Sequence, residues 1–167
     1  MKKLAVIAIL LALFGPSAVL YAAYSGKTAP KPVKSAVTLY KPPSRSELLA
    51  LVNAERAKYG VAPLKEDPRL DQSAQDKADD EVIYNYFGHV SPHDGKQGYL
   101  YMNTVGIHCT SGGENLTENE FGGNTSLTAV ISWTNSPPHH KAMINPDYTL
   151  TGFGINGNQI VEHFCQQ

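Results

Sequence analysis

The chain has 167 residues, of which 42% are hydrophobic and 17% are charged, and its formal net charge at pH 7 is −1. This length suits one domain with a hydrophobic core, and the composition is ordinary for a globular protein. The 14 Lys and Arg residues are scattered along the chain and balanced by 15 Asp and Glu residues, so the sequence lacks the basic patch of a nucleic-acid-binding surface. We therefore expect no nucleic-acid partner.

The first 25 residues are organised like an export signal. Two lysines, Lys2 and Lys3, precede an apolar run over residues 4–14, which Gly15-Pro16 then interrupts. A charged region followed by an apolar region and small residues is typical of a secretory signal peptide. Residues 4–24 are also long enough to cross a bilayer, so an uncleaved N-terminal anchor is the alternative. We expect a secreted, periplasmic or cell-surface protein that contacts the membrane only if this segment is retained.

Residues 26–43 are expected to form a linker. They contain four prolines and four lysines but few large apolar residues, so they cannot build a core of their own. The folded domain is therefore expected to cover residues 44–167.

The first part of this domain has helical periodicity. Ser44-Arg-Ser-Glu47 is a capping-box pattern, and Gly60 is a suitable end for the helix that follows. Asp67-Pro68 predicts a second helix, because Asp caps a helix and Pro is tolerated in its first turn. Its apolar residues recur at four-residue spacing, and the charged residues of its other face, Lys77 among them, are expected to face solvent. A third helix is expected over residues 99–105.

The second part of the domain changes from helix to strand. The stretch over residues 111–124 is polar and Gly-rich, and no regular element is assigned to it. A short helix is expected from Ser126, as its cap, to Trp133, and another over residues 139–143 after two prolines. The chain then ends in two extended segments around Asn156-Gly157, a dipeptide favoured in type I′ hairpins. Helices first and strands last, without βαβ alternation, predict an α+β layered domain.

The chain has two cysteines, Cys109 and Cys165. An even number of cysteines in an exported protein favours a disulfide bond. Such a bond would close a loop of about 57 residues, which is worth roughly 4 kcal/mol in the chain-entropy model. Two buried free thiols are the alternative.

Three polar side chains stand where the backbone is constrained. His89 follows the second helix and precedes Ser-Pro, Glu114 follows two glycines, and His139 follows two prolines. The three residues are 25 positions apart in each case, so no local motif connects them. The sequence chemistry alone does not predict that they converge.

Five short motifs connect these residues to a known family. They are Leu49-Ala-Leu-Val-Asn-Ala-Glu-Arg56, Phe87-Gly-His-Val-Ser-Pro92, Gly113-Glu-Asn-Leu116, Trp133-x-x-Ser-Pro-x-His139 with Asn145-Pro146, and Thr151-Gly-Phe-Gly-Ile155. With these motifs in this order, the domain resembles the CAP superfamily of cysteine-rich secretory proteins, antigen 5 and plant pathogenesis-related proteins. It looks closest to the bacterial branch. The resemblance implies a single-domain α-β-α sandwich with a cleft.

In that family two histidines and two glutamates line the cleft, and a divalent metal, often zinc, can bind the histidines. By resemblance, His89 and His139 match the histidines and Glu114 matches the glutamate of the Gly-Glu-Asn motif. The second glutamate is expected at the position of Ser136, so the fourth group is missing. The implied ligand cleft consists of His89, Glu114, Ser136 and His139, with His89 and His139 as candidate ligands of zinc or another divalent cation. His163 alternates with apolar residues on one strand face and is expected to be structural.

An alternative structural interpretation remains open for these residues. His89 and His139 could form a hydrogen-bonded pair that joins two loops, with Glu114 accepting a hydrogen bond from one ring. In that case the three residues would stabilise the fold and bind nothing.

Three functions are compatible with this sequence. We favour an exported, non-enzymatic binding module that takes a lipid, glycan or peptide in its cleft. The alternatives are a structural or adhesive envelope protein held by its N-terminus, and a zinc-dependent hydrolase in which His89 and His139 hold the metal and Glu114 is the general base. The missing second glutamate weighs against the hydrolase, so catalytic activity is not expected.

Overall fold

The structure is a computed structural model that describes residues 41–118 and 125–167. The expected export signal and most of the expected linker lie outside these residues. Within the described part of the chain, no helix is long and apolar enough to cross a membrane.

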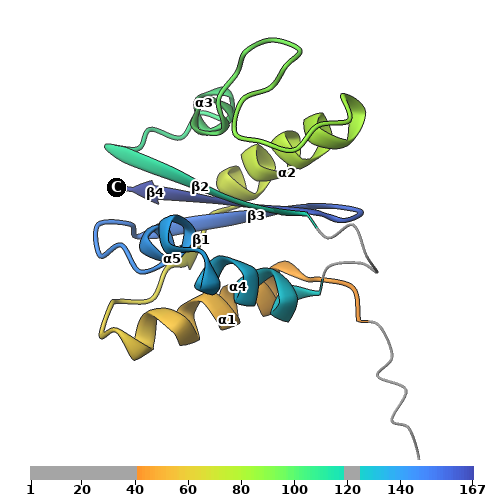
Figure 1. Cartoon of the computed structure of the whole chain (residues 1–167). Coiled ribbons are helices and arrows are strands. Elements are labelled where there is room, and N and C mark those ends of the chain that lie inside the picture. Colours follow the sequence, from red (N-terminus) through yellow and green to blue (C-terminus); the bar gives the residue numbers. More distant parts are fainter. Residues whose placement is uncertain (1–40, 119–124) are drawn as a thin grey trace, which may run out of the picture. The chain divides into compact units, whose positions relative to one another are not determined.

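The described residues form a four-stranded sheet with helices on both faces (Figure 1). The elements in chain order are α1 (Arg45–Lys58), β1 (Lys65–Glu66), α2 (Pro68–Ile83), α3 (Gly98–Thr104), β2 (Ser111–Glu118), α4 (Ser126–Asn135), α5 (Pro137–Met143), β3 (Leu150–Asn156) and β4 (Gln159–Gln166). The strand order is β1-β3-β4-β2, with β1 parallel to β3 and the other pairs antiparallel. Helices α2 and α3 cover one face, and α1, α4 and α5 cover the other. The predicted α-β-α sandwich is confirmed.

The helix starts differ in part from those expected. Asp67 caps α2 as predicted, since its side chain accepts a hydrogen bond from the backbone N–H of Arg69 at 2.9 Å. The Ser44 side chain, however, makes no capping bond, so the predicted capping box of α1 is wrong. The cap of α4 is Thr125 and not Ser126, because the hydroxyl of Ser126 accepts a hydrogen bond from the backbone N–H of Ser44 at 3.0 Å. This contact joins the starts of α1 and α4.

Strand β2 is the element to which the sequence pattern assigned no regular structure. It pairs with β4 over its whole length, and Glu114 lies opposite His163 while Asn115 lies opposite Glu162. Of the two glycines that make the stretch look like a loop, Gly113 is required by packing, whereas a Cβ at Gly112 would make ordinary contacts of 3.4 Å. A Cβ added to Gly113 would lie 2.7 Å from the hydroxyl of Tyr148.

The C-terminal hairpin is confirmed, but its turn lies one residue later than expected. Asn156 pairs with Gln159, so the two turn residues are Gly157 and Asn158. Gly157 has a φ of +57°, a left-handed conformation that glycine adopts without steric cost.

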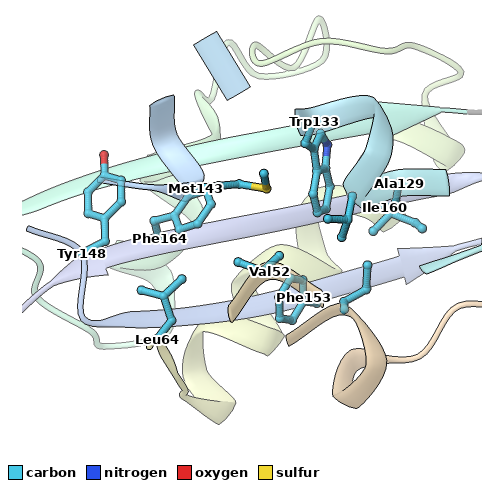
Figure 2. Packing of buried hydrophobic residues seen from close by; sticks show 11 residues of the cluster. Val52, Leu64, Ala129, Trp133, Met143, Tyr148, Phe153, Ile160 and Phe164 are labelled. Carbon is cyan, nitrogen blue, oxygen red and sulfur yellow. The ribbon is translucent and has the colours of Figure 1, made fainter. Parts of the chain in front are cut away.

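The main core lies between the sheet and the layer of α1, α4 and α5 (Figure 2). Its largest member, Trp133, is fully buried, and its indole N–H donates a hydrogen bond to the carbonyl of Leu116 at 3.0 Å. On the opposite face, Gly152 and Gly154 let α2 pack directly on β3, because a Cβ at either position would lie within 2.2 Å of backbone atoms of α2. Helix α2 is therefore held at a fixed distance from the strands that carry the site.

Arg56 is a fully buried charge in the same layer as the main core. Its guanidinium donates four hydrogen bonds of 2.7–3.1 Å to backbone carbonyls, those of Ala62, Met143, Asn145 and Tyr148. It therefore ties the end of α1 to the segment that leads from α5 to β3.

The predicted disulfide bond between Cys109 and Cys165 is confirmed, with the two Cα atoms 5.3 Å apart. It joins the segment after α3 to β4, on the face of the sheet that carries the candidate site.

Candidate functional site

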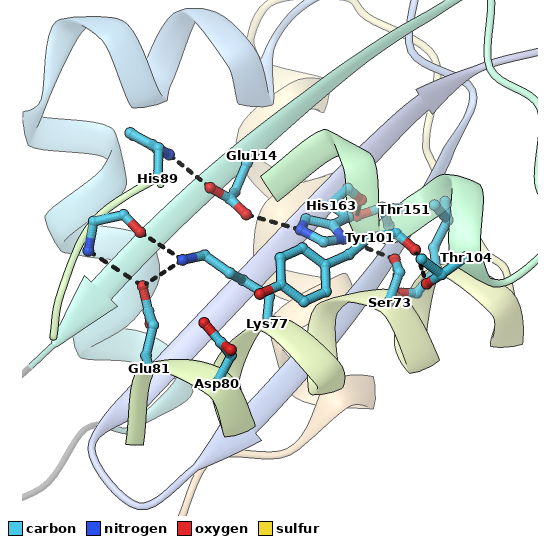
Figure 3. Close-up of polar contacts among 12 residues, drawn as sticks. Ser73, Lys77, Asp80, Glu81, His89, Tyr101, Thr104, Glu114, Thr151 and His163 are labelled. Atoms are coloured by element: carbon cyan, nitrogen blue, oxygen red, sulfur yellow. Dashed lines mark hydrogen bonds and ion pairs between the residues drawn. The ribbon is translucent and has the colours of Figure 1, made fainter. Parts of the chain in front are cut away.

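Glu114 is the centre of the candidate site, and two histidines hold its carboxylate (Figure 3). Oε1 lies 2.7 Å from Nδ1 of His89, in the loop after α2, and Oε2 lies 2.9 Å from Nε2 of His163. The second contact is a direct consequence of the register, because Glu114 and His163 are opposite each other in β2 and β4. The structure thus brings His89 and Glu114 together as the resemblance implied.

The other side of His163 is also fixed. Its Nδ1 lies 2.7 Å from the hydroxyl of Ser73 on α2, and this hydroxyl lies 3.0 Å from the carbonyl of Leu70. Ser73 and His163 are both fully buried. A continuous chain of hydrogen bonds therefore runs from α2 through β4 and β2 to the loop that holds His89.

The electrostatics favour a negatively charged Glu114. Burial raises the pKa of its carboxyl group, but the hydrogen bonds from His163 and His89 outweigh burial, and the net pKa lies below its usual value. The same carboxylate raises the pKa of His89 above its usual value, and this gain outweighs the opposing effect of burial. Glu114 and His89 thus stabilise each other's charged forms.

His139 approaches from the other layer of the sandwich, on α5. Burial and the nearby charge of His89 lower the pKa of its imidazole, so the neutral form is favoured. Its Nδ1 is buried and has no hydrogen-bond partner, while its backbone carbonyl accepts a hydrogen bond from the Asn115 side chain at 3.2 Å. No hydrogen bond between described residues joins the rings of His89 and His139, so the alternative of a directly bonded histidine pair is not supported.

A small pocket of about 180 Å³ opens beside Glu114. Its lining comprises His89, Gln97, Gly98, Gly112, Gly113 and Glu114. Gly98 allows the start of α3 to lie against the carboxylate, because a Cβ there would lie 1.8 Å from Oε2 of Glu114. The backbone N–H of Gly98 donates to the carbonyl of His89 at 3.0 Å, which fixes the loop beside the pocket.

Ser136 does not belong to this pocket. It lies at the junction of α4 and α5, its side chain makes no capping bond there, and it is not part of the lining. The prediction that placed Ser136 in the cleft followed only from its position in the motif, and nothing in the structure adds to it.

The donor set does not fit a catalytic zinc site. Such sites use three protein ligands and an open position. Among the described residues, no group of three or more His, Cys, Asp or Glu side chains could hold a metal ion. His89 and His139 supply at most two ligands, and both oxygens of Glu114 are already bound by imidazoles.

A buried ion pair supports the loop that carries His89. Lys77 and Glu81 are buried on α2 with Nζ and Oε1 3.2 Å apart, and Lys77 also donates to the carbonyl of Gly88 at 2.5 Å. The expectation that Lys77 faces solvent is wrong, because the chain after α2 folds back over it. The ion pair fixes the residue before His89 and so helps to orient the imidazole.

Sequence reasoning assigned none of Ser73, Lys77 and His163 to the site, although it expected His163 to be structural, which agrees with the buried, doubly bonded imidazole. The strand pattern around His163 gave a usable signal, since it placed a histidine among buried residues. A buried imidazole needs hydrogen-bond partners. Which partners it finds depends on the pairing of β2 with β4, which the sequence pattern did not reveal.

The three-layer fold and the cleft around Glu114 define a CAP-type domain. A sequence model described as "Cysteine-rich secretory protein family" matches residues 49–166, and the chain belongs to this CAP family.

Two proteins of Bacillus subtilis (strain 168) are similar in sequence. The chain is 37% identical to "Uncharacterized protein YkwD" over 120 residues, which is 72% of this chain and 44% of that protein. It is 32% identical to "Uncharacterized membrane protein YlbC" over 126 residues, which is 74% of this chain and 35% of that protein. The chain thus spans less than half the length of these relatives.

Solved structures share the fold. An extracellular SCP-domain protein of Bacillus anthracis matches with a TM-score of 0.68 and 23% identity, over 74% of this chain and 40% of that one. An outer surface protein of Borrelia burgdorferi matches with a TM-score of 0.65 and 21% identity, over 73% and 91% of the two chains. Both of these structural neighbours are named as extracellular or outer-surface proteins.

Proposed function

We propose that this CAP-domain protein is an extracytoplasmic binding module whose cleft at His89 and Glu114 holds a polar part of a lipid, glycan or peptide. The signal-like N-terminus, the disulfide bond and the extracellular or surface relatives support the location outside the cytoplasm. The pocket of about 180 Å³ suits one small group and not a long chain. The ligand therefore inserts a single polar group, and the rest of it lies outside.

One observation carries the choice of binding over catalysis. Both oxygens of Glu114 accept hydrogen bonds from imidazoles, which hold the carboxylate in place and keep its pKa below the usual value against the effect of burial, so Glu114 is a weak general base. The hydroxyl of Ser73, which contacts His163, is fully buried and cannot meet a substrate. The chain of hydrogen bonds from Ser73 through His163 to Glu114 thus orients the carboxylate and supplies no nucleophile.

The test is a titration of the exported protein followed through the imidazole resonances of His89 by NMR. The probes represent the three classes of ligand: N-acetylglucosamine, the dipeptide Ala-Ala and decanoate. We expect one class to shift the His89 resonances in a saturable manner. Gly112→Ala should weaken this effect, because the added methyl group narrows the lining while its nearest neighbours lie an acceptable 3.4 Å away.

Ser136→Ala is the matched control, since Ser136 lies outside the lining and should leave the affinity unchanged. If none of the three probes shifts His89, the binding proposal is wrong and a structural role remains. A zinc titration by calorimetry addresses the hydrolase. Micromolar binding lost in both His89→Ala and His139→Ala would restore that alternative.

A further inference from the structure

A second, larger pocket lies away from the cleft at Glu114. It has a volume of about 450 Å³ and is formed by the end of α2 with the residues that follow it, the end of β2, and the β3–β4 hairpin. Apart from Phe87, no residue of the family motifs named above lines it, and no step of the proposed function uses it. Its lining combines unpartnered acceptor atoms, negative charge and an apolar wall.

Two buried acceptor atoms without partners belong to side chains that line this pocket. They are Oε2 of Glu81 and Oε1 of Gln159, and the two residues are 1% and 6% exposed. The amide of Gln159 cannot simply be reversed, because its Nε2 already donates to the Glu118 carboxylate at 2.9 Å. Buried acceptors without donors are costly, so a ligand that supplies N–H or O–H groups would be stabilised here.

The charge of the lining is negative. Glu81 and Glu118 both contribute to it, and the described lining residues include no Lys, Arg or His. Lys77 balances Glu81 from inside the protein, whereas the ion pairs between described residues include none for Glu118. One net negative charge therefore faces the pocket, and a cationic donor fits it better than a neutral one.

The same pocket has an apolar wall. Val82 and Phe87 line it and are 46% and 51% exposed, respectively. An aliphatic stem could pack against this wall, and a cation near the face of an aromatic ring gains a further attraction.

We propose that this pocket binds an alkylammonium group, either a lysine side chain of a peptide or a free aliphatic diamine. The ammonium group donates to the Glu81 and Gln159 acceptors and neutralises Glu118, while its methylene groups contact Val82 and Phe87. Glu81 also supports the loop that carries His89, but the two pockets share no lining residue, so either binding proposal can fail without the other.

The test is a titration of the exported protein by NMR at low salt, followed through the backbone amides of the β3–β4 hairpin. The probes are 1,5-diaminopentane and the uncharged 1,5-pentanediol of matched length. We expect saturable shifts with the diamine and at least tenfold weaker binding of the diol. Glu118→Gln should weaken diamine binding at least fivefold while retaining the size of the side chain.

Phe87→Ala should also weaken binding, and because this side chain is half exposed the variant should fold. Asp147→Asn is the matched control, since it removes an exposed carboxylate before the opposite end of β3. Equal binding of the diol, equal losses in Glu118→Gln and Asp147→Asn, or no binding at all would each overturn the proposal. Nα-acetyl-lysine amide then distinguishes the two sources, with its Nε-acetylated form as the uncharged control. Tighter binding of Nα-acetyl-lysine amide than of the diamine indicates a peptide lysine, and the reverse indicates a free diamine.

Discussion

Replacing Glu114 with Gln removes the negative charge between His89 and His163 but preserves the size of the side chain. The amide can still satisfy both rings. Its oxygen accepts a hydrogen bond from Nδ1 of His89. Its NH₂ group donates to Nε2 of His163 once the proton of this imidazole moves to Nδ1. That Nδ1–H then donates to the Ser73 hydroxyl, which in turn donates to the carbonyl of Leu70. Glu114→Gln therefore isolates the contribution of the charge.

The expected cost follows from the burial of the two contacts. A hydrogen bond to a charged group contributes about 1.5–3 kcal/mol, against about 0.5–1.5 kcal/mol for a neutral one. The contact with His163 is buried, whereas the His89 side chain is 56% exposed and solvent screens its contact. We expect Glu114→Gln to lower the free energy of unfolding by about 1–2 kcal/mol, mostly through His163.

The pH dependence of this cost has a defined sign. The folded-state pKa of His89 is raised above its ordinary value of 6.5, so its contribution to stability is complete below pH 6.5 and is lost as pH rises through the folded-state pKa. The folded-state pKa of Glu114 is lowered below 4.5, so its contribution is present above pH 4.5 and is lost as pH falls through the folded-state pKa. The difference in the free energy of unfolding between wild type and Glu114→Gln should therefore be largest between pH 4.5 and pH 6.5.

The assay combines urea denaturation at several pH values with an NMR titration of the His89 ring. In Glu114→Gln the pKa of His89 should fall, because burial remains and the carboxylate is gone. Asp147→Asn should leave it unchanged, since that carboxylate is exposed and distant. An unchanged pKa of His89 in Glu114→Gln would refute the argument that this carboxylate controls the ring.

Three further changes test the fold around the site. Arg56→Met should lower the free energy of unfolding by about 3–5 kcal/mol, because four carbonyls lose a buried donor. Arg69→Met, at an exposed ion pair, is the control and should have a much smaller effect in the same urea experiment. The double variant Cys109→Ala/Cys165→Ala should lose roughly 4 kcal/mol, and a loss below about 1 kcal/mol would contradict the chain-entropy argument. Burial raises the pKa of Glu162 to about 8, so stability should fall as pH rises from 4.5 toward 8, and Glu162→Gln should flatten this part of a plot of Tm against pH.

The sequence predicted those elements whose signals are local. Asp67-Pro68 marked the start of α2, and its four-residue apolar spacing marked the buried face. Strand β2 was missed because Gly113 looks like a turn residue but is required by a neighbour distant in the sequence, the Tyr148 hydroxyl. A local pattern cannot show that a glycine is needed for packing and not for a turn.

The candidate site was predictable only in part for the same reason. The resemblance paired His89 with Glu114, and the structure places their side chains 2.7 Å apart. It said nothing of His163, because the contact between His163 and Glu114 depends on the register of β2 against β4. The Lys77 side chain was predicted to face solvent because helical periodicity describes only α2 itself. The segment that covers Lys77 comes after α2 in the chain and has no periodic pattern.

The Gly-Glu-Asn motif joins the two layers of helices at one strand. Successive residues of a strand point to opposite faces, so Glu114 turns toward His163 and the layer of α2 and α3, while Asn115 turns toward α5 and bonds the carbonyl of His139. Strand β2 is at the edge of the sheet, so residues of both layers can reach it. A shift of one residue in its pairing would exchange the two side chains and remove both contacts at once. The adjacency of Glu and Asn in the sequence is thus a geometric requirement for bringing His89 and His139, from opposite layers, to the same edge.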